Sequence, residues 1–134
     1  MTWTHHEPGD DDYPIHHQAM ASPMVADLDG DCVPEVVFNS YEPATWTNNG
    51  ILRALRGDTG EPLWTLGDPA WRSDGSAIPA IGDIDYDGDL EIVNVGGDGH
   101  LHLVDHMGNP LWATDAPVDP NQTSGGPALA NFDL

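Results

Sequence analysis

The sequence predicts an all-β fold built from repeated units of four short antiparallel strands. A nine-residue acidic stretch occurs twice, as DLDGDCVPE at 27–35 and DIDYDGDLE at 83–91. Around each copy, apolar and β-branched runs alternate with Gly, Pro, Asn and Asp, which is the pattern of strands and turns, and no stretch has helical periodicity. Units of about fifty residues with four strands each are typical of β-propeller blades. We therefore expect about two full blades with partial strands on either side.

Each unit contributes four strands, named A to D, in the same order. The first unit predicts strands at SPMVA (22–26), EVVFN (35–39), ILRAL (51–55) and PLWT (62–65). The second predicts them at AIPAIG (77–82), EIVNV (91–95), HLHLV (100–104) and PLWA (110–113). The acidic stretch joins A to B, and a tight turn joins C to D. The B-to-C connection is long in the first unit and short in the second.

The repeat divides the chain into five segments. These are 1–22, the end of a preceding strand D (Trp3, Thr4) and an acidic, histidine-containing linker; 23–66, the first blade; 67–78, a linker; 79–114, the second blade; and 115–134, a linker and the opening strand A of a third blade. Propellers close with about four to eight blades. We therefore expect the ring to be completed by the rest of a larger propeller or by further copies of the chain.

The acids of each loop stand at positions 1, 3, 5 and 9, so that oxygen atoms from one tight turn can converge on a hard cation. Calcium takes about six to eight oxygen ligands. The expected ligands are the side chains of Asp27, Asp29, Asp31 and Glu35 with the carbonyl of Val33, and the side chains of Asp83, Asp85, Asp87 and Glu91 with the carbonyl of Asp89. An EF-hand loop is longer, ends with Glu at position 12 and lies between helices. Two calcium sites at strand-to-strand corners are therefore predicted, with an acidic turn that binds nothing as the alternative.

The single cysteine, Cys32, takes the position that Gly88 has in the second loop. Such a position often requires a positive φ, which costs a cysteine free energy, so the first site is expected to be looser. One cysteine cannot form an internal disulfide, and without a second thiol a zinc cluster is disfavoured.

The chain is strongly acidic, with 23 Asp and Glu, three Arg or Lys, and a net charge of −20. This large negative charge disfavours binding to nucleic acids and anionic membranes, because such binding needs Lys and Arg to neutralise phosphates. No apolar run is long enough for a membrane span, and the N-terminal residues lack the features of a signal peptide. We therefore expect no membrane insertion and an export signal outside this chain.

The two loops, with SPMVA and PAIGD before them, resemble the FG-GAP or VCBS-type repeats of integrin-alpha-like, calcium-binding β-propellers. The resemblance covers nearly all of 22–134, and it departs from the family at Cys32 and at the third loop, where only NFDL is present. Members include adhesion receptors, fungal lectins, surface and secreted bacterial proteins and some polysaccharide lyases. The resemblance implies an extracellular or cell-surface, non-enzymatic structural or interaction module that binds calcium, with self-assembly through open blade edges as one option.

The loops at the end of each blade opposite the acidic stretches predict a ligand site. Tyr41 and Trp46 come from the long B-to-C loop, and Trp71 and Arg72 from the linker. Aromatic rings beside polar groups can stack on a sugar and bond its hydroxyls, which indicates carbohydrate binding or a protein ligand. The alternative is that Trp46 and Trp71 pack between neighbouring blades.

An enzymatic role is not indicated within this chain. No serine nucleophile motif is present, and the best-placed carboxylates are assigned to calcium. A non-catalytic part of a polysaccharide-degrading enzyme is the remaining alternative from this class.

The histidines do not predict a zinc site, because nothing in their spacing shows convergence of three or four ligands. His100 and His102 alternate along one strand, which suggests a solvated strand face. The pairs in the N-terminal linker, His5, His6, His16 and His17, are expected to be polar linker residues.

The tripeptide Arg56-Gly57-Asp58 falls in the predicted C-to-D turn, where a cell-adhesion recognition sequence would be displayed. Turns favour Gly and Asp for their own reasons, so the turn explains the tripeptide without a partner.

Overall fold

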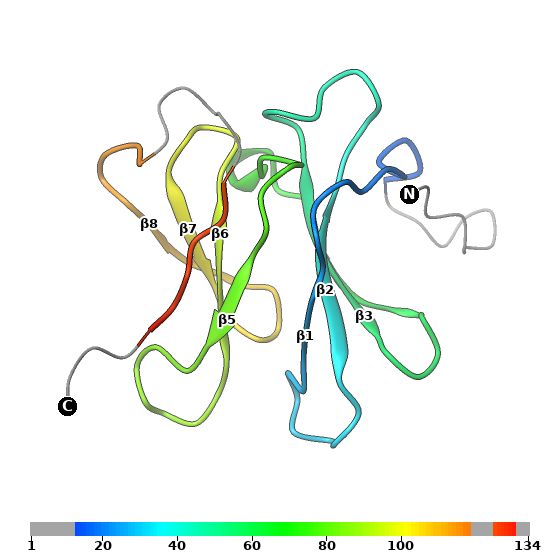
Figure 1. Cartoon of the computed structure of the whole chain (residues 1–134), viewed down its shortest axis with the longest axis vertical. Coiled ribbons are helices and arrows are strands. Elements are labelled where there is room, and N and C mark those ends of the chain that lie inside the picture. Colours follow the sequence, from blue (N-terminus) through cyan, green and yellow to red (C-terminus); the bar gives the residue numbers. More distant parts are fainter. Residues whose placement is uncertain (1–12, 119–124, 131–134) are drawn as a thin grey trace.

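The computed structural model describes residues 13–118 and 125–130 of the 134-residue chain. It contains two four-stranded antiparallel sheets and one short 3₁₀ turn, η1 (Pro69–Trp71) (Figure 1). The first sheet comprises β1 (Met24–Ala26), β2 (Glu35–Ser40), β3 (Ile51–Arg56) and β4 (Pro62–Leu66). The second comprises β5 (Ala80–Gly82), β6 (Glu91–Val95), β7 (Leu101–Val104) and β8 (Pro110–Ala113). In both sheets neighbouring strands follow the chain order, so the β1–β2 and β3–β4 turns lie at one end and the β2–β3 loop at the other.

The all-β prediction and the eight strands in their order are confirmed. The first strand of each sheet is shorter than expected, because β1 begins at Met24 and not at Ser22, and β5 begins at Ala80 and not at Ala77. The turn η1 was not predicted; Asp68 caps it by accepting a hydrogen bond from the Ala70 amide.

The expected flanking strands are only partly within the described residues. Trp3 and Thr4 lie outside them, as do 131–134, while 125–130 is described without a strand. Residues 125–130 run beside β5 (Figure 1). Leu129 lies against Gly82 there, and Gly126 lies against Ile78.

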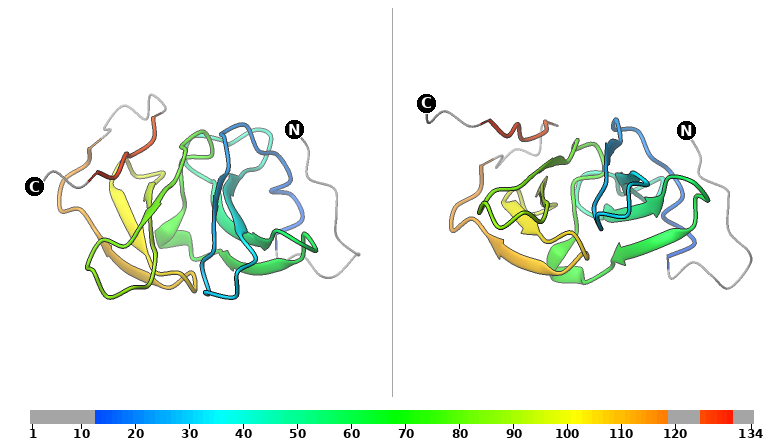
Figure 2. Two further views of the ribbon diagram at one scale, coloured as in Figure 1. Left: turned by 60° about the horizontal axis from the view of Figure 1, so that its bottom comes forward. Right: turned by 90° about the horizontal axis from the view of Figure 1, so that it is seen from below.

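The hydrophobic core lies between the two sheets, which stand side by side (Figure 2). Cross-strand partners share one face of a sheet, so the registered pair Val37 and Ala54 turns the same way, toward the second sheet. Ile92 and Val104 form the facing pair on that second sheet. The buried core residues are Leu28, Val37, Leu52, Ala54, Leu66, Ile92 and Val104.

A buried amide pair joins the sheets. Asn39 on β2 and Asn94 on β6 each donate a side-chain hydrogen bond to the other, at 2.9 and 3.0 Å. Asn39 Nδ2 also donates to the carbonyl of Ala77 at 2.9 Å. Because buried amides need their partners, this pair disfavours any sliding of one sheet past the other.

A tryptophan from the first sheet is seated on a turn of the second. Trp64 Nε1 donates to the carbonyl of His106 at 2.9 Å, and its ring lies against Gly108, which has φ 82°. Trp112 has the same place in the second repeat but is 47% exposed. The β3–β4 and β7–β8 hairpins therefore differ in what covers their tryptophan.

Residues 13–18 cover the outer face of the first sheet. The buried Arg53 on β3 donates to Ser40 Oγ at 2.8 Å and to the carbonyl of Tyr13 at 3.2 Å. His16 is also buried, so it is not the solvated polar side chain that was expected. Burial lowers the pKa of His16, and the neighbouring Arg72 and Arg53 lower it further, which favours the neutral imidazole in the fold.

Candidate metal centres

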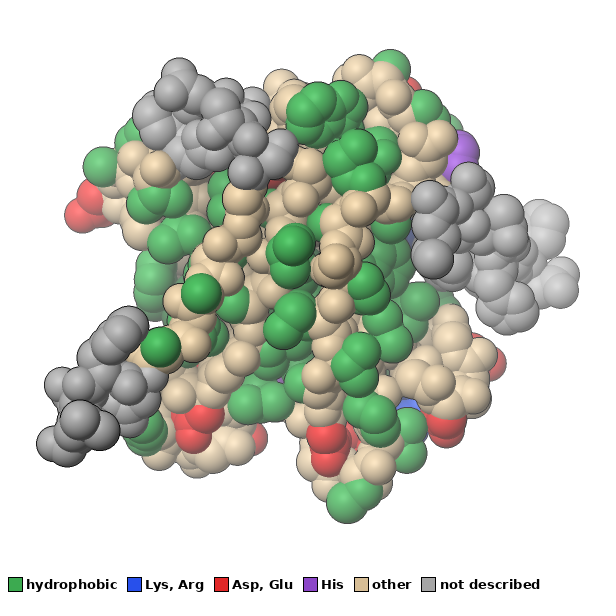
Figure 3. All heavy atoms as spheres, in the orientation of Figure 1, with side chains coloured by type: hydrophobic (Ala, Val, Ile, Leu, Met, Phe, Trp, Pro, Cys, Tyr) green, Lys and Arg blue, Asp and Glu red, His purple; other side chains and the backbone are tan. Residues whose placement is uncertain are grey.

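Three carboxylates converge at the corner between the first two strands of each sheet. One group is Asp27, Asp29 and Glu35, and the other is Asp83, Asp85 and Glu91. In each group one carboxylate oxygen from every member lies within 4.8 Å of the others. Acidic side chains gather at this end of the molecule (Figure 3). Both groups could hold a metal ion.

Short-range hydrogen bonds between amides and aspartates shape each loop. In the first, Asp27 accepts from the amides of Gly30 and Cys32, at 2.9 and 3.0 Å, and Asp29 accepts from Asp31 at 3.2 Å. The second loop has the amide-to-carboxylate bonds Gly88–Asp83 at 3.2 Å, Asp87–Asp85 at 3.3 Å and Asp89–Asp87 at 2.9 Å. Asp side chains favour such local bonds, and here they hold the carboxylates on the inner side of a tight turn.

The glutamate that ends each loop is buried. Glu35 has 0% exposure; its Oε2 accepts from the Leu28 amide at 2.9 Å, but its buried Oε1 has no partner among the described residues. Glu91 has the same bond, to the Ile84 amide at 2.7 Å, and in this loop the buried oxygen without a partner is Asp83 Oδ1. A buried carboxylate oxygen without a partner is costly, and a cation inside the group would satisfy it. The all-oxygen donor set fits a hard cation such as calcium.

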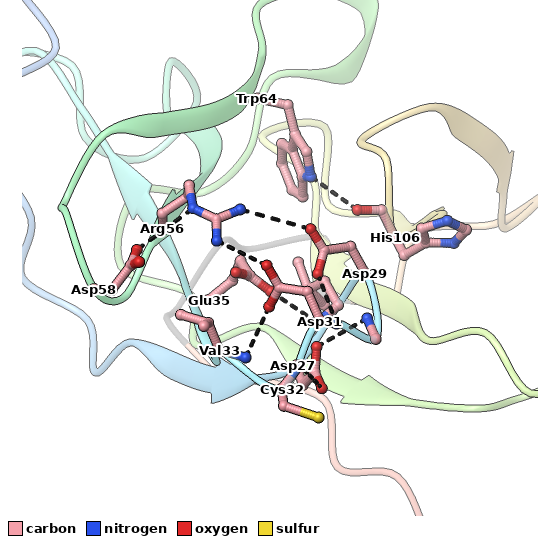
Figure 4. A network of polar contacts seen from close by, with 12 residues as sticks. Asp27, Asp29, Asp31, Cys32, Val33, Glu35, Arg56, Asp58, Trp64 and His106 are labelled. Atoms are coloured by element: carbon pink, nitrogen blue, oxygen red, sulfur yellow. Dashed lines mark hydrogen bonds and ion pairs between the residues drawn. The ribbon is translucent and has the colours of Figure 1, made fainter.

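The two position-5 aspartates, Asp31 and Asp87, lie outside these groups of three. Arg56 Nη2 lies 2.7 Å from Asp31 Oδ2, and Arg56 also reaches Asp29 at 3.8 Å and Asp58 at 3.4 Å (Figure 4). The hydrogen bond from Arg56 holds the pKa of Asp31 below its usual range, and the Val33 amide adds to this effect. That Asp31, Asp87 and the carbonyls of Val33 and Asp89 are ligands remains a prediction.

Both loops need a positive φ at positions 4 and 6. The first has Gly30 at φ 76° and Cys32 at φ 68°, and the second has Tyr86 at φ 65° and Gly88 at φ 100°. The positive φ expected at Cys32 is therefore present. Each loop nevertheless has one glycine and one strained residue, so backbone strain does not by itself make the first loop the looser one.

The predicted aromatic ligand residues of the long loop differ in exposure. Tyr41 is buried, whereas Trp46 is 38% exposed. Gly75 joins this loop to the linker, because its amide donates to the Trp46 carbonyl at 2.7 Å and it lies against the Tyr41 ring.

The predicted linker residues point into the protein. Trp71 packs against the core, with its ring centroid 4.8 Å from that of His102, as expected if it fills the space between the sheets. The Arg72 guanidinium lies 5.1 Å above the ring of Tyr13. A ligand role for Tyr41, Trp46, Trp71 and Arg72 remains a prediction, and Trp46 is the member of this set that is exposed.

His102 on β7, and His100 directly before this strand, both contact other residues of the chain. His102 is buried beside Trp71, with Nε2 3.3 Å from Asp98 Oδ2, so the expected solvated strand face is wrong for this residue. The nitrogen Nδ1 of His100 contacts the carbonyl of Thr114. Burial raises the pKa of Asp98, but the His100 amide and the nearby His102 outweigh this effect and lower it overall. Nothing in the sequence indicates that Trp71, from the linker, covers the face of β7 that carries His102.

The fold is similar to one solved structure, the crystal structure of the V. cholerae biofilm matrix protein Bap1. The match has a TM-score of 0.66 and 30% sequence identity, and it covers 78% of this chain and 19% of the Bap1 chain. No protein-family model and no curated protein matches the chain. The described residues include no helix with the length and hydropathy of a membrane span.

Proposed function

We propose that this chain is a calcium-binding, non-enzymatic repeat segment of a β-propeller and serves as a structural or interaction module of an exported or surface protein. One observation carries the proposal: equivalent groups of three carboxylates converge at the same corner of both sheets, and each group has a buried oxygen without a partner among the described residues. A buried carboxylate oxygen without a partner is costly, and a cation bound inside each group would remove this cost.

The donor chemistry favours calcium over other common ions. Zinc prefers nitrogen and sulfur ligands, and magnesium demands a strict octahedron with several waters. Calcium accepts an irregular set of oxygens, which suits carboxylates and a carbonyl from one flexible loop. The ion would neutralise the mutual repulsion of the carboxylates and stabilise the fold, because it binds the folded state and not the unfolded chain.

The propeller assignment is supported by the sequence repeat and by the side-by-side arrangement of the two sheets. The first strands, β1 and β5, lie near each other, and 125–130 runs beside β5 where the first strand of a third unit would lie. We accordingly assign blades to 23–66 and 79–114, a linker to 67–78, the end of a preceding blade to 1–22 and the start of a further blade to 115–134. The likeness to a biofilm matrix protein supports a structural role outside the cell.

The test is the calcium dependence of folding. The purified chain should bind two calcium ions by elemental analysis after gel filtration, and its melting temperature should fall by many degrees when a chelator is added. The double variant E35Q/E91Q is the control, because each glutamine can still accept the loop amide but has no charge. An unchanged melt with chelator, together with no bound calcium, would contradict the proposal.

A carbohydrate-binding role at the opposite end is a second candidate, favoured by the exposed indole of Trp46. Exposed aromatic rings stack on sugars. Glycan-array binding that is lost in W46A and kept in E35Q/E91Q would support this role, and a uniformly negative array would count against it.

A further inference from the structure

We propose that Arg56 is an internal counter-cation that competes with the metal ion for the carboxylates of the first loop, and so makes 27–35 the weaker of two unequal sites. The inference rests on the proposed calcium binding and goes beyond it, because it assigns a residue outside the loop to the control of affinity.

The contacts of Arg56 place its charge on two expected metal ligands. Its guanidinium lies 2.7 Å from Asp31 Oδ2 and 3.8 Å from Asp29 Oδ2 (Figure 4). Asp29 belongs to the group of three carboxylates, and Asp31 is the acid of this loop that lies outside the group. Arg56 holds Asp31 Oδ2, and the Val33 amide donates to Asp31 Oδ1 at 2.7 Å, so Asp31 would have to give up or share one of these bonds to turn toward an ion in that group.

The strand that carries Arg56 directs it to the loop. Arg56 is the last residue of β3 and is paired in register with Glu35, the last acid of the loop. It also contacts Asp58 in the following turn, at 3.4 Å. The guanidinium is therefore held beside the acidic loop by two contacts, one with Asp31 of the loop and one with Asp58 of the turn.

The second repeat has no such cation. The registered pairs Val37–Ala54 and Val93–Leu103 align the two sheets and place Asp105 where the first repeat has Arg56. The Asp105 carboxylate accepts from the amides of its own turn, including Asn109 at 2.7 Å. No arginine contacts 83–91 within the part of the chain that the structure describes; the nearest basic group is His106, whose Nδ1 lies 3.9 Å from Asp89.

Local charge is then more negative at the second site. The first loop has four acids, with Arg56 and Asp58 beside it, which gives −4 + 1 − 1 = −4, and the second has five acids and Asp105, which gives −5 − 1 = −6. Calcium affinity rises with the number of charged ligands. Even at the dielectric constant of water, a divalent ion and a single positive charge about 6 Å apart repel each other enough to weaken binding about tenfold, so we expect Arg56 to lower the affinity of the first site by about this factor.

Calorimetric calcium titrations of the full chain test the inference. Wild type is expected to show a tighter and a weaker site, with the weaker one lost in E35Q and the tighter one lost in E91Q. In the E91Q background, which leaves the first loop alone, R56Q should raise calcium affinity about tenfold. The conservative variant R56K keeps the charge and should keep most of the suppression.

Each result separates the inference from the function on which it rests. If wild type binds calcium but R56Q leaves the first site unchanged or weakens it, Arg56 is not a competitor, while the proposed calcium binding stands. If R56K raises affinity as much as R56Q, charge is not the cause and the inference also fails. If wild type binds no calcium, both fall. Should E91Q fold poorly, R56Q alone still decides, because it should bring the two affinities of the intact chain closer together.

Discussion

The two acidic loops have the same carboxylate geometry but differ in how their backbone and their charge are accommodated. The first uses glycine at position 4 and strains Cys32 at position 6, and the second strains Tyr86 at position 4 and uses glycine at position 6. The first has an arginine against its aspartates, and the second has none among its described neighbours. Backbone strain is thus balanced between the loops while charge is not, so electrostatics and not loop strain should separate their behaviour.

Removing the buried glutamate of each loop should have the largest effect. E35Q and E91Q are each expected to abolish the calcium-dependent part of stability at their own site, about 2.7 kcal/mol at a hundredfold excess over Kd. Without calcium the same variants should be neutral or stabilising, because each removes a buried negative charge that lies beside other carboxylates while the glutamine can still accept the loop amide. Thermal melts with and without chelator measure this, and E35Q destabilising both forms equally would show that Glu35 is structural only.

The next largest difference should be in how much each hairpin tryptophan, Trp64 or Trp112, contributes to the free energy of unfolding. W64A removes a ring seated on the turn at 106–108 and should lower the free energy of unfolding by about 2 kcal/mol, less than for a fully buried tryptophan. W112A, at an exposed position, should change it by about 0.5 kcal/mol or less. Chemical denaturation gives both values. Equal costs would mean that something covers Trp112 in solution.

Exchanging the strained residues should give a smaller and symmetrical gain. C32G and Y86G each relieve a positive φ, and each should stabilise the metal-free protein by about 0.5–1 kcal/mol. G30A and G88A are the matched reversals; an added methyl group meets no neighbour at either position, so only backbone strain should lower stability. The denaturant midpoint measures the stability of all four variants. If only one of C32G and Y86G is stabilised, the backbone strain is not equal in the two loops.

The pH dependence of the first loop should give the smallest effect. Arg56 keeps the pKa of Asp31 below its ordinary value of 3.8, so the pair stabilises the fold above that pH and loses its effect as the pH falls through the lowered pKa. In metal-free protein, R56Q should therefore make the loss of stability below pH 4 shallower. Melting curves in a pH series measure this, and a parallel shift of the whole profile would argue against the ion pair.

The strands could be predicted from the sequence because their signals are local. Alternating apolar residues, turn glycines and the repeated acid spacing all act within one hairpin. The convergence of Asp27, Asp29 and Glu35 followed from the same local spacing.

Features that depend on the neighbouring element could not be predicted in this way. His102 is buried because the linker residue Trp71 covers it, and His16 is buried because its segment folds over the first sheet. The Asn39–Asn94 pair joins positions that are not equivalent in the two repeats, so aligning the copies could not reveal it. Arg56 was assigned only to a turn, and its contact with Asp31 could not be predicted because it joins positions 25 residues apart.

The short first strand of each sheet has a mechanical consequence. β1 and β5 each pair with their neighbour over three residues, so a pull along the chain would peel them away one hydrogen-bonded pair at a time. Peeling would start at the open end of the hairpin, at Met24–Val37, and reach Ala26–Glu35 last; an ion held by Asp27 and Glu35 would keep the loop closed after the strand has separated. The calcium level of the surrounding medium would then decide whether the nine residues of each loop lengthen under tension once the first strand has peeled away.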